Sequence, residues 1–145
     1  MDKIKRNDYV WKLSAGTQMN TVRCGFSHPV IFIFDMSNDE VIVPEVGYEF
    51  QVSSNDNCIA IRVISDTDGD VEISLELQQP SSVKRERNEI FCGKVASPSG
   101  SISISSSEMD EVLRLDVGAK ITSIHVYIDD IADPVKVWIE ANKID

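Results

Sequence analysis

The chain has 145 residues and a formal net charge of −10, from 24 acidic and 14 basic residues. This length is typical of one domain, which we expect over residues 1–145, and the excess of carboxylates argues against nucleic acids and anionic membranes as partners. The composition instead suits solubility, cations or a basic protein partner. The first residues lack the apolar run of a signal peptide, and no apolar stretch is long enough to span a bilayer, so we expect a cytoplasmic protein.

Alternation of apolar and polar residues predicts a series of short β-strands. In chain order, the predicted strands cover residues 9–13, 30–34, 48–52, 59–63, 71–77, 102–104, 113–117, 124–128 and 135–139. The segment VIFIF (residues 30–34) is apolar on both faces, which predicts a central strand covered on both sides. Turn residues recur about every 8–12 positions, as in β-sandwiches and barrels. We therefore expect a single all-β domain, an antiparallel β-sandwich of jelly-roll type with little or no helix.

The acidic segment SDTDGD, residues 65–70, predicts a hairpin with a loop at residues 67–69. In this register the apolar residues of 59–63 and 71–77 lie on one face of the paired strands. A loop shorter by one residue would set apolar rows against polar ones. Gly69 stands at the last loop position, where the backbone usually takes a left-handed conformation. The segment is therefore interpreted first as a tight turn.

The alternating aspartates of the same segment also suggest a cation site. An EF-hand loop is excluded, because the sixth and twelfth positions counted from Asp66 are Val71 and Leu77 instead of glycine and glutamate. The predicted register places Asp66 opposite Asp70, where like charges repel and either a bound cation or solvent screening would relieve them. We expect no metal site, and a weak cation site at Asp66 and Asp70 is the alternative.

Motifs for catalysis are absent from the sequence. The two histidines, His28 and His125, show no metal-ligand spacing, and neither a nucleophile elbow nor a phosphate-binding glycine loop occurs. The cysteines, Cys24, Cys58 and Cys92, form no C-x-x-C pair and predict small, reduced, buried residues, with a disulfide or metal site as the alternative. We therefore expect a protein that is not an enzyme and binds no cofactor.

Two features of the last predicted strands favour a binding role. Aromatic residues fall on the polar face of these strands: His125, Tyr127 and Trp138. Three aspartates occupy the turn DDIADP, which would join the strands as a hairpin: Asp129, Asp130 and Asp133. An aromatic patch with an acidic rim would suit a basic protein partner. Trp138 also fits a second core or the rim of the sheet, and both interpretations stay open.

Three segments in the second half of the chain share a recognisable pattern: DGDVEISLELQQP, NEIFCGKVASPSGSISISSS and EVLRLDVGAKITSIHVYID. They contain a strand, a Pro-Ser-Gly turn before a short strand, and an apolar strand that leads into a turn and a long final strand. Over residues 58–129 this pattern resembles the competence protein J family. One departure is DVGAK, where that family usually has a proline-glycine turn followed by an aromatic residue. No binding residue matches a family motif.

The resemblance implies a function. Members of that family are small β-sandwich proteins that inhibit a nuclease of DNA uptake, and related proteins occur beside bacterial toxins as immunity partners. It implies an immunity or inhibitor protein that neutralises a bacterial toxin, in the first place a nuclease, whose basic cleft a carboxylate-rich surface can occupy. The expected contact residues are Asp66, Asp68, Asp70, His125, Tyr127, Asp129, Asp130, Asp133 and Trp138. The alternatives are a carbohydrate- or calcium-binding module and a structural or assembly subunit.

Overall fold

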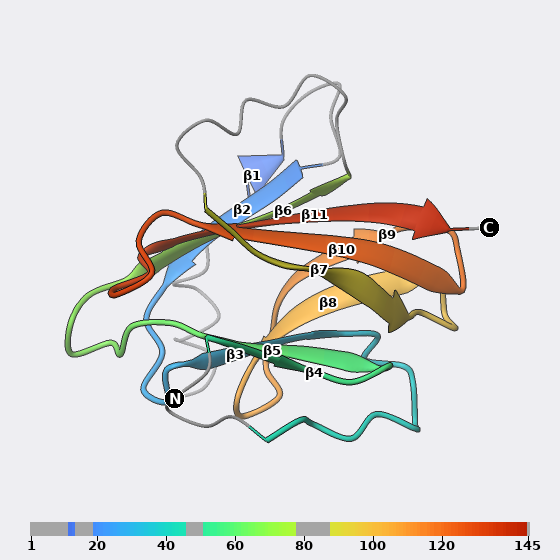
Figure 1. The fold of residues 1–145 in the computed structure, drawn as a ribbon, viewed down its shortest axis with the longest axis horizontal. Helices are drawn as coiled ribbons and strands as arrows, with labels where there is room; N and C mark the ends of the chain where they lie inside the picture. Colours follow the sequence, from blue (N-terminus) through green and yellow to red (C-terminus); the bar gives the residue numbers. More distant parts are fainter. Residues whose placement is uncertain (1–11, 14–18, 46–50, 78–87, 145) are drawn as a thin grey trace.

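The computed structural model describes residues 12–13, 19–45, 51–77 and 88–144. These residues form strands and connections and contain no helix, so none of them supplies an apolar helix of the length that crosses a bilayer. The strands are arranged in two sheets, which form two layers (Figure 1). The predicted all-β class is therefore confirmed.

Six strands form the first layer. Their bounds are β1 Lys12–Leu13, β2 Met19–Cys24, β6 Val71–Leu77, β7 Asn88–Ala96, β10 Ile121–Ile128 and β11 Lys136–Ile144. They lie in the order β1-β2-β6-β11-β10-β7, and all neighbours pair antiparallel except β6 and β11, which are parallel. The strand predicted at residues 9–13 lies partly outside the described residues, while β2 and β7 are strands that the sequence pattern missed.

Five strands form the second layer. Their bounds are β3 Val30–Phe34, β4 Val52–Ser54, β5 Cys58–Arg62, β8 Ser101–Ser106 and β9 Glu111–Asp116. They lie in the order β4-β5-β3-β8-β9, and every pair is antiparallel. The strand predicted at residues 48–52 lies partly outside the described residues. The expected jelly-roll connectivity stays a prediction.

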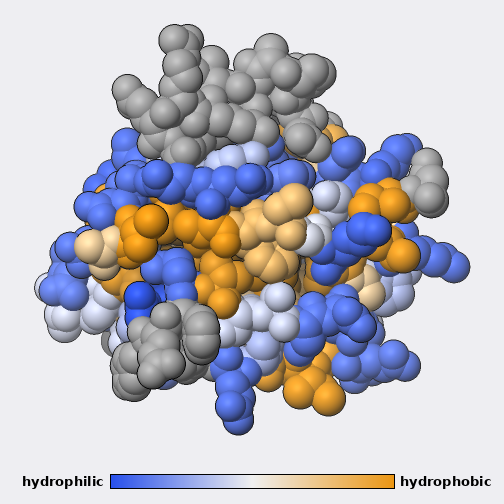
Figure 2. All heavy atoms as spheres, in the orientation of Figure 1, coloured by the Kyte–Doolittle hydropathy of each residue, from blue (hydrophilic) through white to orange (hydrophobic). Residues whose placement is uncertain are grey.

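Apolar side chains on the inner faces of both sheets form one hydrophobic core. Ile73 and Leu75 of the six-stranded sheet and Ile59 and Ile104 of the five-stranded sheet belong to it, each with no exposed surface. Figure 2 shows apolar residues across the middle of this face, with hydrophilic residues above them and a mixture of hydrophilic and apolar residues below. Burial of these rows explains why period-two alternation marks the strands so clearly.

β3 occupies the centre of its sheet and is buried at all five positions, as predicted. Ile31 and Ile33 face the main core, whereas the other three residues of β3 belong to a second cluster on the other face. That second cluster includes Cys58 and Ala60 of β5, and Val41 packs against it. A strand covered on both faces has no polar side, which accounts for the uninterrupted VIFIF run.

The connection between β5 and β6 corrects the hairpin predicted for residues 65–70. β5 pairs with β3 and β4, whereas β6 pairs with β2 and β11, so the two strands belong to different sheets. Apolar rows that match across a hairpin match equally well when two sheets face each other across a core, and here the second solution applies. The local turn itself forms: the N–H of Asp68 donates to the carbonyl of Ser65 at 2.9 Å, and Gly69 has a φ of +138°.

β10 and β11 form the hairpin predicted for the end of the chain. Tyr127 lies directly opposite Trp138 in its register. Asp129 stabilises the turn, because its Oδ1 accepts the backbone N–H groups of Val135 at 3.1 Å and Lys136 at 3.0 Å. The predicted placement of the aromatic residues on one face is thereby confirmed.

Candidate functional site

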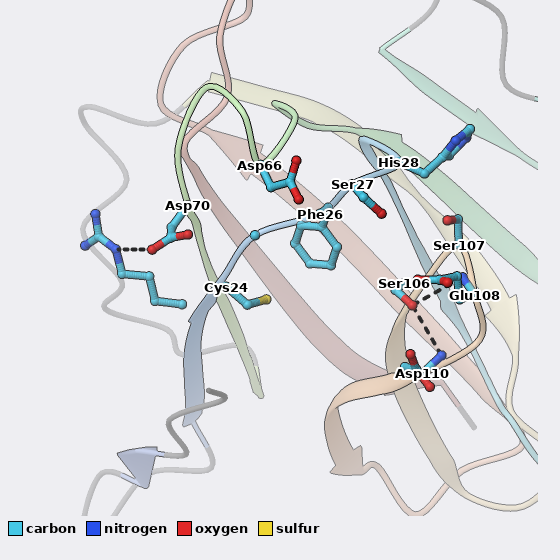
Figure 3. Close-up of a pocket in the computed structure, with 12 residues that line it drawn as sticks. Cys24, Phe26, Ser27, His28, Asp66, Asp70, Ser106, Ser107, Glu108 and Asp110 are labelled. Carbon is cyan, nitrogen blue, oxygen red and sulfur yellow. Dashed lines mark hydrogen bonds and ion pairs between the residues drawn. The ribbon is translucent and has the colours of Figure 1, made fainter. Parts of the chain in front are cut away.

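A pocket lies where three connections meet at one end of the two sheets (Figure 3). It has a volume of about 480 Å³. Its lining residues come from three segments: 23–28 at the end of β2, 65–70 between β5 and β6, and 106–110 between β8 and β9. Because β2 and β8 belong to different sheets, the pocket bridges the two layers. Its acidic lining residues are Asp66, Asp70, Glu108 and Asp110. We refer to this site as the acidic pocket.

One wall of the acidic pocket depends on a close approach at Gly25. A Cβ atom at this position would lie 2.9 Å from Cβ of Asp66 and 3.4 Å from Oδ1 of Asp70. A distance of 2.9 Å is shorter than real Cβ contacts in proteins. Residue 25 therefore has to be glycine for the connection that follows β5 to lie this close. The backbone N–H of Asp66 donates to the carbonyl of Phe26 at 2.8 Å and ties the two segments together.

Ser106 organises the opposite wall. Its Oγ accepts the backbone N–H groups of Glu108 at 3.2 Å and Asp110 at 3.3 Å, and its own N–H donates to the carbonyl of Asp110 at 3.0 Å. Met109 completes this tight turn with a φ of +65°. Figure 3 shows Ser106, Glu108 and Asp110 across the pocket from Asp66. Both acidic residues of this turn are exposed to solvent.

The charges around the acidic pocket favour a cationic ligand. Arg23 is the one arginine or lysine among its lining residues in the described chain, and its Nε lies 4.0 Å from Oδ2 of Asp70. Both side chains are largely exposed, at 66% and 57%, so this ion pair is screened and contributes little. Burial, followed by the charge of Asp70, raises the pKa of the Cys24 thiol to about 12, and Cys24 therefore remains a neutral thiol at neutral pH.

The structure brings some of the predicted contact residues into this pocket. Asp66 and Asp70 line it, and Asp68 lies exposed in the same connection. The cation site predicted at Asp66 and Asp70 assumed that they face each other across paired strands, and that pairing does not form. Glu108 and Asp110 were missed by sequence reasoning. Their signal was the acidic turn in SSSEMDE, whose position beside the 65–70 connection only the stacking of the sheets reveals.

The predicted aromatic residues lie elsewhere, on the outer face of the six-stranded sheet. The rings of His125 and Tyr127 stack, with centroids 6.4 Å apart and planes inclined by 11°. Tyr127 is only 5% exposed, whereas His125 and Trp138 are half-buried. Tyr127 therefore offers little surface to a partner. The contact of these residues with a partner stays a prediction.

The turn beside the aromatic residues has its own structural needs. The carboxylate of Asp129 accepts two backbone N–H groups of the turn, and Oδ1 of Asp130 accepts the N–H of Ala132 at 2.9 Å. Asp133 is exposed. The first two residues thus have a sufficient reason to be aspartate within the hairpin, and partner binding by all three stays a prediction.

The cysteines fall into two kinds. Cys24 and Cys58 are buried, as predicted, and burial raises the pKa of Cys58 to about 12. Cys92 is exposed, so its predicted burial is wrong. Cys92 lies beside Glu89 and His125, and one donor atom from each residue lies within 4.8 Å of the others. In the described part of the chain, these three residues form the one group whose donor atoms are close enough to approach a common metal ion.

Comparison with solved structures identifies the fold. The crystal structure of ComJ from Bacillus subtilis, the inhibitor of the DNA degrading activity of NucA, matches 90% of this chain and 100% of that chain with a TM-score of 0.65 at 12% sequence identity. This chain has the ComJ fold. The resemblance inferred from the sequence is thus confirmed at the level of the fold.

A second solved structure, of crocagin biosynthetic gene J, matches 89% of this chain and 97% of that chain with a TM-score of 0.49 at 10% identity. No family model matches the sequence, and no curated protein matches it either.

Proposed function

We propose that this chain is an inhibitor or immunity protein that binds a basic toxin, in the first place a nuclease, and that the acidic pocket receives an arginine or lysine side chain of that partner. The observation that supports the proposal is the convergence of four carboxylates around one pocket of about 480 Å³. ComJ, which has the same fold, inhibits a nuclease. A nuclease must present cations to hold phosphates, and those cations suit this pocket.

The pocket offers a physical route to inhibition. Asp66 and Asp110 approach the pocket from opposite walls, so a guanidinium between them would form charge-assisted hydrogen bonds on both sides. A partner arginine occupied in this way no longer binds a phosphate of DNA. The net charge of −10 would also accelerate the encounter with a basic protein at low ionic strength.

A binding and activity assay with matched variants tests this proposal. The partner is the purified product of the neighbouring gene, if it degrades DNA, because immunity proteins are encoded beside their toxins. The double variant Asp66→Asn with Asp110→Asn should weaken binding by about 30-fold or more, equivalent to about 2 kcal/mol, and release DNA degradation. The control, Asp39→Asn with Glu40→Gln, removes the same charge from exposed positions after β3, at the other end of the sheets, and should change binding less than about threefold.

The pattern of losses separates the explanations. An equal loss in both double variants would mean that net charge alone attracts the partner, and the pocket would have no special role. Unchanged binding in both variants would contradict the pocket as the interface. Binding that does not weaken as salt rises would contradict the electrostatic basis of the proposal.

A further inference from the structure

Glu89, Cys92 and His125 form a cluster on the outer face of the six-stranded sheet, which we call the thiol cluster. Cys92 of β7 pairs directly with His125 of β10. A β-bulge then shifts the register, so that Tyr127 pairs with Glu89 and Ile90 is passed over. Side chains alternate between the two faces of a strand, so a regular register would place Ile90 opposite Tyr127, on the same face as Cys92. The bulge thus brings a carboxylate, instead of an isoleucine, next to the imidazole.

The two nitrogens of His125 face different neighbours. Nδ1 lies 2.7 Å from Oε2 of Glu89, and Nε2 lies 4.0 Å from Sγ of Cys92. An ionised carboxylate only accepts hydrogen bonds, so Nδ1 bears the proton of the neutral ring and the lone pair of Nε2 faces the thiol. Thiol, imidazole and carboxylate therefore stand in the order that activates a nucleophile: the base next to the thiol, and a third group that orients the base.

The surroundings of His125 stabilise this arrangement. Its ring stacks on Tyr127, which is almost completely buried and limits the rotation of the imidazole. On β11, the register partner of His125 is the buried Glu140, so an imidazolium would lie between the strands that bear Glu89 and Glu140. Lys94 follows Cys92 on the same face of β7 and is exposed. The carboxylate of Glu89, next to Nδ1, orients the ring and would balance the charge of an imidazolium formed when the thiol gives up its proton.

The geometry of the thiol cluster suits proton transfer better than it suits a bound metal ion. Glu89 and Nδ1 already bind each other at 2.7 Å, which leaves Nε2 and Sγ as the two protein ligands. Zinc sites in proteins use three or four. Cys92 also differs from the other two thiols, because it is exposed to solvent and belongs to β7, an edge strand of its sheet.

We propose that Cys92 is a site of thiol–disulfide exchange with small disulfides. The proton of the Cys92 thiol passes to Nε2 of His125, and the thiolate attacks one sulfur of the disulfide. A new S–S bond forms as the old one breaks, and the leaving thiolate takes the proton from the imidazolium. The small disulfide is thereby reduced to one free thiol, while Cys92 is oxidised to a mixed disulfide. The thiol cluster shares no residue with the acidic pocket, so this proposal is independent of the proposed function.

The rate of reaction with 5,5′-dithiobis(2-nitrobenzoate), an aromatic disulfide, tests the proposal in the folded protein. We expect one equivalent of thiol to react, with mass mapping to Cys92. His125→Gln should slow this reaction at least about tenfold, because the base is lost. Ser123→Ala, a change on the same outer face of β10, is the control and should leave the rate unchanged.

The role of Glu89 as a positioning residue requires its own comparison. Glu89→Gln should slow the reaction, and Glu89→Asp should restore part of the rate, a rescue that a purely structural role does not predict. Melting temperatures show whether each variant is folded. If His125→Gln is unstable, the rates of Glu89→Gln and Glu89→Asp decide whether the cluster activates Cys92.

Three results would overturn the proposal. The first is an equal rate in the wild-type and His125→Gln proteins. The second is modification of Cys24 or Cys58 in preference to Cys92. The third is a one-to-one complex with Zn²⁺ in calorimetry that is lost in Cys92→Ser, His125→Gln and Glu89→Gln alike, since the cluster would then be a metal site.

Discussion

Two regions of this molecule place a cysteine near a carboxylate, and they do so with opposite chemical results. At the acidic pocket, Cys24 is buried, and its burial and the charge of Asp70 raise its pKa to about 12. In the thiol cluster, an imidazole stands between the exposed Cys92 and the carboxylate of Glu89. A carboxylate that acts directly on a thiol opposes the thiolate, whereas a carboxylate behind an imidazole supports the base. The order of the groups decides the chemistry more than their kinds do.

The largest effect expected from this contrast is a loss of stability at alkaline pH. Cys24 and Cys58 have a pKa of about 12 in the folded chain, against 9.0 for an ordinary thiol. At a pH between these two pKa values, the thiols of the unfolded chain release protons that the same thiols keep in the folded chain. The free energy of unfolding should therefore fall as pH rises through this window, by about 1.4 kcal/mol per pH unit for each cysteine, and this loss should be absent at lower pH.

Urea unfolding between about pH 9 and pH 11 measures this slope. The double variant Cys24→Ala with Cys58→Ala should show a shallower decline than the wild-type protein, whatever its stability at neutral pH. Ser123→Ala, which removes no titratable group, should keep the wild-type slope. A wild-type slope in the double variant would mean that other groups cause the alkaline loss.

A smaller effect should distinguish the glycines of the two regions. Gly25→Ala should lower the free energy of unfolding by about 2 kcal/mol, because the new Cβ would meet Cβ of Asp66 at 2.9 Å, close to a backbone that is tied to Phe26. Gly93→Ala, next to the thiol cluster, would instead meet Cζ of the Phe91 ring at 2.6 Å, and a half-buried ring has more freedom to move than backbone. We expect a smaller loss there in denaturant unfolding, and equal losses would contradict the account of the pocket wall.

The smallest expected effect concerns the cation at the edge of the acidic pocket. Arg23→Gln leaves the pocket more acidic and should strengthen binding of the basic partner about twofold, since the exposed pair with Asp70 is weak. Titration calorimetry at low salt measures this change. Weaker binding by Arg23→Gln would contradict a cationic ligand.

Much of the fold could be predicted because every second side chain along its strands is buried. The VIFIF segment correctly indicated a central strand, and the alternation on either side of DDIADP correctly indicated the last hairpin, with Tyr127 and Trp138 on one face. β7 escaped detection because its bulge at Ile90 interrupts the alternation. That same irregularity aligns Glu89 with His125, so the feature that hid the strand also forms the thiol cluster.

The site was less predictable, because its residues come from connections and not from strands. Asp66 and Asp70 were selected for their place in a supposed hairpin, and they line the acidic pocket for a different reason. Glu108 and Asp110 lie about 40 residues along the chain from Asp66 and Asp70. No local sequence pattern could link these residues to Gly25, whose missing side chain allows Asp66 and Asp70 to lie close to the end of β2.

The sequence by itself determined where strands form, which face of each is apolar, and the excess of negative charge, since these follow from local alternation and composition. Only the tertiary structure decided which strands pair. An apolar row satisfies its burial equally well beside a hairpin partner or against a facing sheet, so β5 and β6 could separate into two layers without any change of pattern. That separation brings residues 23–28, 65–70 and 106–110 together. A register shift of one residue in β7 brings the carboxylate of Glu89 next to the imidazole of His125.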